Sequence, residues 1–117
     1  MNLRSKIDKL LQDGYPISED PADGVALPTS TVLRLIEVLE GSKVAIRGIE
    51  VWRLESFGPV VAPVPTEEEF ECRRIALEPA SDYASRSRNA VLAYLESRQD
   101  DGRAIFAVDF DEQQEAA

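Results

Sequence analysis

The most regular pattern of hydrophobic and polar positions lies between residues 29 and 41. Thr29 or Ser30 is expected to cap a helix there, and Gly41 is suited to the left-handed residue that ends one. Between these limits the apolar side chains recur at the i, i+3, i+4 and i+7 spacing of an amphipathic helix: Val32, Leu35, Ile36 and Leu39. The pattern predicts a helix across this segment.

Helical spacing also occurs at the N-terminus and after residue 80. Residues 5–12 place apolar side chains at helical spacing, and Gly14 follows as a stop, which predicts a short helix. A second long helix is predicted from Ser81, its candidate cap, with Asp82 against the positive end of the helix dipole. Its inner positions are expected to be Tyr83, Ser87, Ala90, Val91, Tyr94 and Leu95.

The segment between the first two helices, residues 14–28, is rich in proline and acidic side chains. This composition favours a loop that wraps over the surface. Its length is unusual for a compact domain. We expect either a functional loop or a first helix that is loosely attached to the rest.

Extended chain is predicted from Lys43 to Glu55, which is dense in β-branched residues. The alternation changes parity at Gly48, so we expect a bulge or a break into two strands there. Gly58 and Pro59 predict a turn, after which Val60 to Val64 forms a short edge segment limited by Pro63 and Pro65.

Two more strands are expected in the second half of the chain. Phe70 to Leu77 is one, despite the poor strand propensity of its charged residues. After a turn at Asp100 to Gly102, the apolar segment IFAVDF within Ala104 to Phe110 predicts a strand in the middle of a sheet.

The order of these elements predicts an α+β fold. We expect one antiparallel or mixed sheet of about four to five strands, with two long helices packed on it and a short N-terminal helix. The 117 residues contain no internal repeat and fit a single domain, residues 1–117. Within it, residues 1–28 are the N-terminal helix and loop, 29–110 the α+β core and 111–117 an acidic tail.

Composition narrows the possible chemistry. The chain has no histidine, one cysteine and a formal net charge of −9. It therefore lacks the usual general acid or base and the commonest transition-metal ligand, and a lone Cys72 forms neither an internal disulfide nor a zinc cage. We expect no cofactor, no bound metal and no catalytic residues, although carboxylate pairs remain capable of chemistry.

The charge also bears on partners and location. The N-terminal residues lack the apolar core of a signal peptide, and no segment approaches the roughly 20 apolar residues of a membrane span, so a cytoplasmic protein is expected. A net charge of −9 repels nucleic acid and anionic membranes. A basic protein is the partner that the charge favours.

The densest acidic run surrounds Phe70. Consecutive side chains do not converge on a metal, and the spacing of an EF-hand is missing, so the run is either a solvated face or an electrostatic docking surface. Asp109, Asp111 and Glu112 extend it if the last strand ends nearby. The candidate partner-binding residues are Glu67, Glu68, Glu69, Glu71, Glu50 and Trp52.

Two single residues have alternative interpretations. Trp52 is either a core residue or an interface anchor with a large contact area. Cys72 is interpreted as a small buried hydrophobe, since the chain offers no histidine to activate it.

Several ordered segments resemble one known family. A helix that ends in a glycine is followed by KVAIRGIEVWRLESFG, EFECRR, SDYASRSRNAVLAYLESR and IFAVDF, an order similar to the immunity protein 40 family of bacterial polymorphic toxin systems. The resemblance spans about Leu27 to Phe110, and Ser87 and Ala90 fit the serine and alanine of the family's second long helix. Of the family's glycine-glycine-aspartate signature only Gly48, and loosely Glu50, correspond.

The resemblance implies a small cytoplasmic α+β protein that neutralises a cognate toxin by binding it. With the charge, it predicts an acidic protein that occludes the basic cleft of a toxin. Two other classes stay open. A non-catalytic adaptor or subunit of a larger assembly would expose an apolar patch of several hundred Å². A carboxylate-dependent hydrolase would need two acids facing one cleft, roughly 5 to 10 Å apart.

Overall fold

A computed structural model describes residues 2–99 and 102–112 of the chain. Three α-helices, one 3-10 turn and five strands follow one another. In chain order they are α1 (Leu3–Leu11), β1 (Tyr15–Pro16), η1 (Pro21–Asp23), β2 (Val25–Pro28), α2 (Thr29–Leu39), β3 (Val44–Phe57), β4 (Val60–Glu71), α3 (Ala80–Ser97) and β5 (Ala104–Glu112). No described helix is long and apolar enough to cross a membrane.

The strands form one antiparallel sheet in the order β1-β2-β5-β3-β4. The predicted α+β class is confirmed, and so is the central position of the IFAVDF segment, because β5 lies between β2 and β3. The sheet is curled, and β1 approaches β4 although the two are not hydrogen-bonded neighbours. The curl gives the sheet a hollow side.

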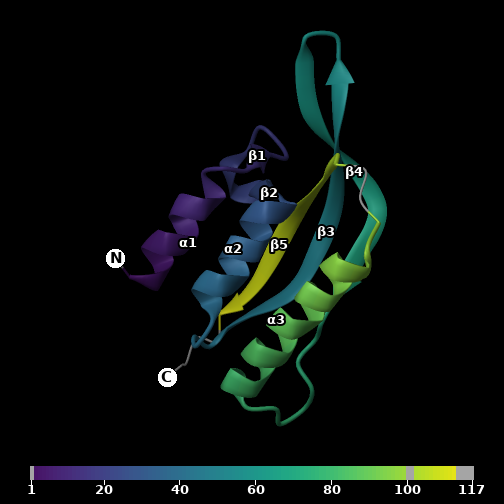
Figure 1. Cartoon of the computed structure of the whole chain (residues 1–117). Coiled ribbons are helices and arrows are strands. Elements are labelled where there is room, and N and C mark those ends of the chain that lie inside the picture. The colour runs from purple at the N-terminus through teal and green to yellow at the C-terminus, as the bar shows by residue number, and fades with distance from the viewer. Residues whose placement is uncertain (1, 100–101, 113–117) are drawn as a thin grey trace.

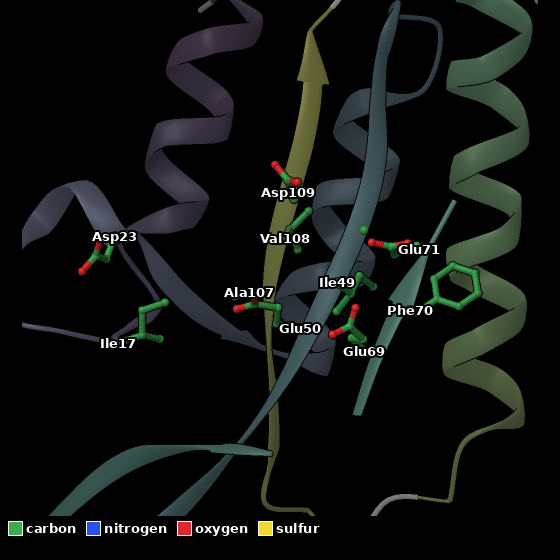
Figure 2. Close-up of a pocket in the computed structure, with 11 residues that line it drawn as sticks. Ile17, Asp23, Ile49, Glu50, Glu69, Phe70, Glu71, Ala107, Val108 and Asp109 are labelled. Atoms are coloured by element: carbon green, nitrogen blue, oxygen red, sulfur yellow. The ribbon is translucent and has the colours of Figure 1, made fainter. Parts of the chain in front are cut away.

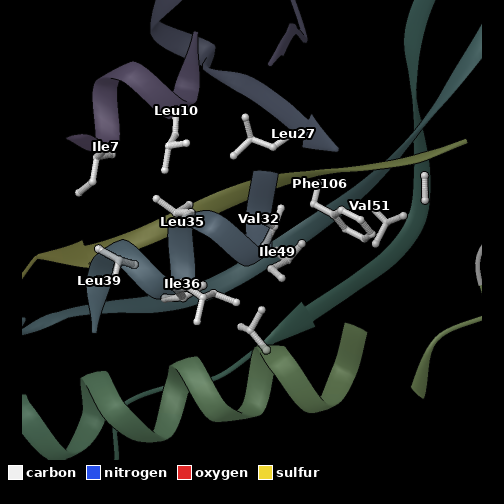
Figure 3. Close-up of a cluster of buried hydrophobic side chains, with 13 residues drawn as sticks. Ile7, Leu10, Leu27, Val32, Leu35, Ile36, Leu39, Ile49, Val51 and Phe106 are labelled. Carbon is white, nitrogen blue, oxygen red and sulfur yellow. The ribbon is translucent and has the colours of Figure 1, made fainter. Parts of the chain in front are cut away.

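All three helices lie on the other side of the sheet (Figure 1). The α3 helix packs on β3, α2 packs on β2 and β5, and α1 rests against α2. One cluster of buried side chains joins these elements (Figure 3), including Ile7 and Leu10 from α1, so the first helix contributes directly to the core. Phe106 of β5, only 1% exposed, is among the largest fully buried side chains.

The expected irregularity near Gly48 is a bulge within one continuous strand. The register with β5 passes from Ile46 to Gly48 and leaves Arg47 as the extra residue. Because of that extra residue, Ile46 and Ile49 both reach the helix-covered core although three positions separate them. The bulge therefore explains why the hydrophobic alternation of the sequence changes parity near Gly48.

The predicted loop over residues 14–28 is partly wrong. Tyr15–Pro16 and Val25–Pro28 are strands at one end of the sheet, where β2 pairs with β5. Ala26 and Leu27 are completely buried, and this burial outweighs the turn-like composition. The prolines are tolerated because they sit at strand ends near the edge of the sheet.

The predicted strand from Phe70 to Leu77 is also wrong beyond Glu71. After the Cys72 amide donates to Arg47 O, the chain leaves the sheet, and Leu77 takes a left-handed φ of 68° that no strand contains. Local bonds hold this connection: the Arg74 guanidinium donates to Glu78 O, and the Ile75 amide donates to the Glu78 carboxylate.

Two expected helix caps are corrected as well. Pro28 and Pro79 occupy the N-cap positions of α2 and α3, with no side-chain cap bond, so Thr29 and Ser81 lie inside their helices. Proline has a backbone geometry compatible with the position just before a helix, which moves each start by one or two residues. Gly41, with φ 83°, ends α2 as predicted.

The β3–β4 hairpin is much longer than the rest of the sheet. Gly58, with φ 66°, and Pro59 form the predicted turn, but β4 continues through Pro63 and Pro65 to Glu71. The pairing of β5 with β3 stops at Arg53. Residues 54–63, called the β-arm below, therefore extend beyond the body of the molecule, as Figure 1 shows at the top of the view.

Candidate functional site

Acidic residues alternate with core residues along the three strands β3, β4 and β5. Glu50 stands between the buried Ile49 and Val51, Glu69 precedes Phe70, and Asp109 follows Val108. Because successive side chains of a strand point to opposite faces, each of these acids points away from the helices. The uncovered face of the sheet is consequently acidic.

These acids line a depression of about 280 Å³ in the curled sheet, called the acidic hollow below (Figure 2). Gly48 lies between Glu71 and Asp109 in register, and its missing side chain leaves the floor open. A Cβ atom at Gly48 would lie 3.0 Å from Phe70 O, so a side chain here would require the β4 backbone to shift by a few tenths of an ångström. The lining residues are Ile17, Asp23, Gly48, Ile49, Glu50, Glu69, Phe70, Glu71, Ala107, Val108 and Asp109.

Glu50 and Glu69 are direct cross-strand partners in this hollow. Both are exposed, and within the described residues neither carboxylate has an ion-pair partner. Like charges placed directly opposite each other destabilise a sheet. The fold therefore places two carboxylates at cross-strand positions here, with no ion-pair partner for either among the described residues.

The acids on either side of Gly48 in the hollow, Glu71 and Asp109, each form an ion pair with an arginine. Arg47, the bulged residue, donates from Nε to Asp109 Oδ2 over 3.0 Å, and this hydrogen bond raises the pKa of the arginine. Arg73 Nη2 lies 3.2 Å from Glu71 Oε1 in an exposed pair. Exposed pairs of this kind contribute little to stability.

Glu68 has a different environment from its neighbours in the run. Arg98 donates two hydrogen bonds of 2.8 Å to its carboxylate, and the Tyr94 hydroxyl donates a third. The Arg98 bonds, followed by that of Tyr94, lower the pKa of Glu68 to about 2. Burial, together with the bond to Glu68, raises the pKa of Tyr94 to about 12. Glu68 is thus tied to α3 on the helix-covered side.

A bulge in β4 explains why consecutive glutamates differ so sharply. Glu50 pairs with Glu69 but Trp52 pairs with Pro65, so β4 holds two more residues than β3 in this interval. Thr66 Oγ1 donates to Val51 O over 2.6 Å and accepts from the Glu68 amide, which fixes the bulge. Glu67 lies in it and is exposed.

Trp52 is half-buried at the base of the β-arm. It lies between Pro65 and Ile105 in register, on the same face of β3 as Glu50. Ile105, directly beside it, is only 2% exposed. The tryptophan therefore packs at the end of the acidic hollow and keeps part of its surface accessible.

Of the six candidates, the structure brings Glu50, Glu69 and Glu71 into one hollow, places Trp52 next to it, and separates Glu67 and Glu68. Asp109 joins the hollow as anticipated, whereas the Asp111 side chain lies in a neighbouring depression with Arg47. The Glu112 side chain lies outside the described part of the chain. Asp23 and Ile17 were missed, since only the curl of the sheet brings the β1–β2 connection to this face.

The chemistry of the hollow is that of carboxylates alone. Within the described residues, no group of three or more histidine, cysteine, aspartate or glutamate side chains is arranged to hold a metal ion. Cys72, 8% exposed, is buried as expected beside α3. Its sulfur accepts a hydrogen bond from Arg86 at 3.3 Å. Arg86 also binds Glu78, and this contact lowers the pKa of Glu78 to about 2.

Comparison with family models, with curated proteins and with solved structures gives no match for this chain.

Proposed function

We propose that this protein is a non-catalytic inhibitor that binds a basic protein, in the manner of the immunity proteins that its sequence resembles. The observation that supports this most directly is the acidic hollow, in which Glu50 and Glu69 are cross-strand partners and no cation of the described residues forms an ion pair with either. Such an arrangement costs stability in the free protein. A lysine or arginine of a partner, entering between the two carboxylates, would relieve the repulsion on binding.

The inhibitory mechanism is occlusion of a cationic surface. A cytoplasmic toxin that acts on an anionic substrate carries a basic cleft, and an acidic protein with a net charge of −9 competes for that cleft. Coulomb attraction raises the rate of encounter, and the hollow supplies the specific contacts once the two surfaces meet. This chain contributes no bond-breaking step.

Charge reversal in the hollow tests the proposal. The binding probe is the purified product of the reading frame adjacent to this chain's gene, which the proposal expects to be a basic toxin domain, in an inactivated form. We expect Glu50→Lys with Glu69→Lys to weaken the complex by about 100-fold, measured by surface plasmon resonance. The paired lysines keep the like-charge arrangement, so circular dichroism and thermal unfolding should change little.

The matched control reverses two exposed acids on the helices. Glu37→Lys with Glu96→Lys changes the net charge by the same amount at positions on α2 and α3, away from the hollow. We expect this variant to bind within about threefold of the wild type. Equal losses in both variants would mean that only net charge matters, and no binding by the wild type would contradict the proposed function.

A second candidate is favoured by the same pair of acids. Glu50 and Glu69 are cross-strand partners in one depression, which places two acids in one cleft, as a carboxylate-dependent hydrolase requires. Glu50→Gln distinguishes the two functions. If the protein is a hydrolase, the wild type turns over members of a glycoside library and Glu50→Gln does not. If it is an inhibitor, neither the wild type nor Glu50→Gln shows turnover, and the variant loses only a modest part of its affinity for the partner.

A further inference from the structure

The β-arm presents apolar side chains to solvent at the end of the molecule farthest from the chain connection at residues 72–79 (Figure 1). Phe57, Val60 and Val61 are 57%, 57% and 55% exposed. Glu55 is the arm's one charged residue, and it is paired with Arg53 at its base through a contact of 3.2 Å. In a chain with a net charge of −9, this is a mostly apolar extension with a single charged residue at its base.

Addition of a strand to the β4 edge does not explain the arm. The Leu54 amide donates to Arg103 O on the β5 side, so Leu54 and its partner Pro63 are not hydrogen-bonded to each other. The backbone nitrogen of Pro63 therefore faces the outer edge of β4. That of Pro65, two residues further along the strand, faces the same edge. Prolines at these positions block another strand from pairing with that edge. At this edge, contacts of the arm therefore come from its side-chain faces.

The two faces of the arm differ in their connection to the rest of the molecule. Leu54, Val61 and Pro63 share the face of the strands that carries Glu50 and Trp52. Phe57 and Val60 form the pair next to the turn on the opposite face, which continues toward the helices. The first face, called the open face of the arm, runs without interruption by a charged side chain from Trp52 to the tip.

The size of the apolar tip argues against a second copy of this chain as its partner. The three half-exposed side chains, of which only Val61 lies on the open face, offer on the order of 300 Å², well under the roughly 800 Å² that each partner contributes to a stable interface. A stable complex through the tip therefore needs an adjoining surface. That surface is the acidic hollow, which repels another acidic chain and attracts a basic one.

We propose that the open face of the arm and the acidic hollow form one continuous docking surface for a basic protein, in which the arm supplies the apolar anchor. This inference rests on the proposed function and assigns separate roles to its two parts. The hollow governs the rate of association and its dependence on salt. The arm, through desolvated contacts of Leu54 and Val61, governs the lifetime of the complex.

Val60 and Val61 provide a matched pair for the test, because they are adjacent, identical and almost equally exposed, yet lie on opposite faces of the arm. The probe is again the inactivated product of the adjacent reading frame. We expect Val61→Gln to raise the dissociation rate about tenfold, with the association rate and its salt dependence unchanged. Val60→Gln should change the dissociation rate by less than about twofold. Neither substitution adds charge, so electrostatic attraction is preserved.

The remaining outcomes are equally decisive. Equal dissociation rates for the two variants, or a larger effect of Val60→Gln, would overturn the role of the open face while the proposed function stands. Failure of the wild type to bind the probe would remove both. Self-association of the wild type in sedimentation velocity, abolished by Val61→Gln, would show that a second copy occupies the arm and would also overturn the inference.

Discussion

Glu68 and Glu69 are consecutive residues in opposite environments. On the helix-covered side, Glu68 accepts two bonds of 2.8 Å from Arg98 and another from Tyr94, whose ring stacks on Phe70 with centroids 4.7 Å apart. On the open side, Glu69 faces Glu50. On the helix-covered face the carboxylate of Glu68 is paired, whereas on the other face Glu50 and Glu69 have no ion-pair partner among the described residues.

The difference separates a carboxylate that the fold holds in an ion pair from carboxylates that the proposed function assigns to binding. Charged groups inside a fold are paired because an unpaired charge is costly to desolvate. At the surface the same cost is smaller, and a fold can retain repelling charges where a partner will neutralise them. Glu68, although 41% exposed, is paired with Arg98, whereas Glu50 and Glu69 have no ion-pair partner among the described residues, as the proposed function expects of a docking surface.

The largest expected effect contrasts adjacent positions of β5. Phe106→Ala removes a side chain that is 1% exposed in the helix-covered core and should lower the free energy of unfolding by about 3–5 kcal/mol. Ala107→Ser adds a hydroxyl in the hollow and should change it by less than about 0.5 kcal/mol. Urea denaturation measures both. Similar costs at the two positions would contradict the assignment of the core to one face.

A smaller effect, the pH dependence of stability, distinguishes Glu68 from the acids of the acidic hollow. The folded-state pKa of Glu68, about 2, lies below its ordinary value of 4.5, so its stabilisation is present above pH 4.5 and is lost as the pH falls toward 2. Since its side chain is 41% exposed, we expect Glu68→Gln to cost only about 1–2 kcal/mol at pH 7.

The difference in the free energy of unfolding between the wild type and Glu68→Gln should disappear toward pH 2. Taking this difference removes the contribution of the other carboxylates, because they titrate in both proteins. Urea denaturation at a series of pH values gives the curve. A difference that stays constant with pH would show that the variant acts through packing rather than through the charge of Glu68.

The smallest effect has the opposite sign at the next residue. Glu69→Gln removes the repulsion with Glu50 and should raise the free energy of unfolding by about 0.2–1 kcal/mol at low salt. The gain should shrink at 0.5 M NaCl, where exposed charges are screened. A loss of stability, like that expected for Glu68→Gln, would remove the distinction between the two faces.

Much of the fold could be predicted because its strongest elements carry regular patterns. The spacing of Val32, Leu35, Ile36 and Leu39 predicted α2, and the apolar run of β5 predicted its central position. Gly58 and Pro59 predicted the turn of the hairpin. These signals are local, so they needed no knowledge of the rest of the chain.

The errors arose where distant contacts outweigh local composition. Residues 14–28 have the composition of a loop, yet Leu27 is drawn into the core beside β5. Residues 72–77 have the hydrophobicity of a strand, yet Glu78 and Arg86 hold them in another conformation. In both places the tertiary environment decides the local structure.

The acidic site was half predicted for a similar reason. The density of the glutamate run identified Glu69 and Glu71, and the alternation along β3 was consistent with Glu50 beside them. The β4 bulge, which turns Glu68 toward Arg98, has no signal in the run itself. The contribution of Asp23 depends on the curl of the sheet, which is a property of the whole fold.

The most direct test of the docking role proposed for the acidic hollow is the salt dependence of association. The rate constant for binding the product of the adjacent reading frame is measured between 50 and 500 mM NaCl, for the wild type and for Glu50→Gln with Glu69→Gln. We predict that the wild-type rate falls at least tenfold over this range and that the double variant shows a clearly shallower slope. Identical slopes for the two proteins, or a wild-type rate that does not change with salt, would contradict it.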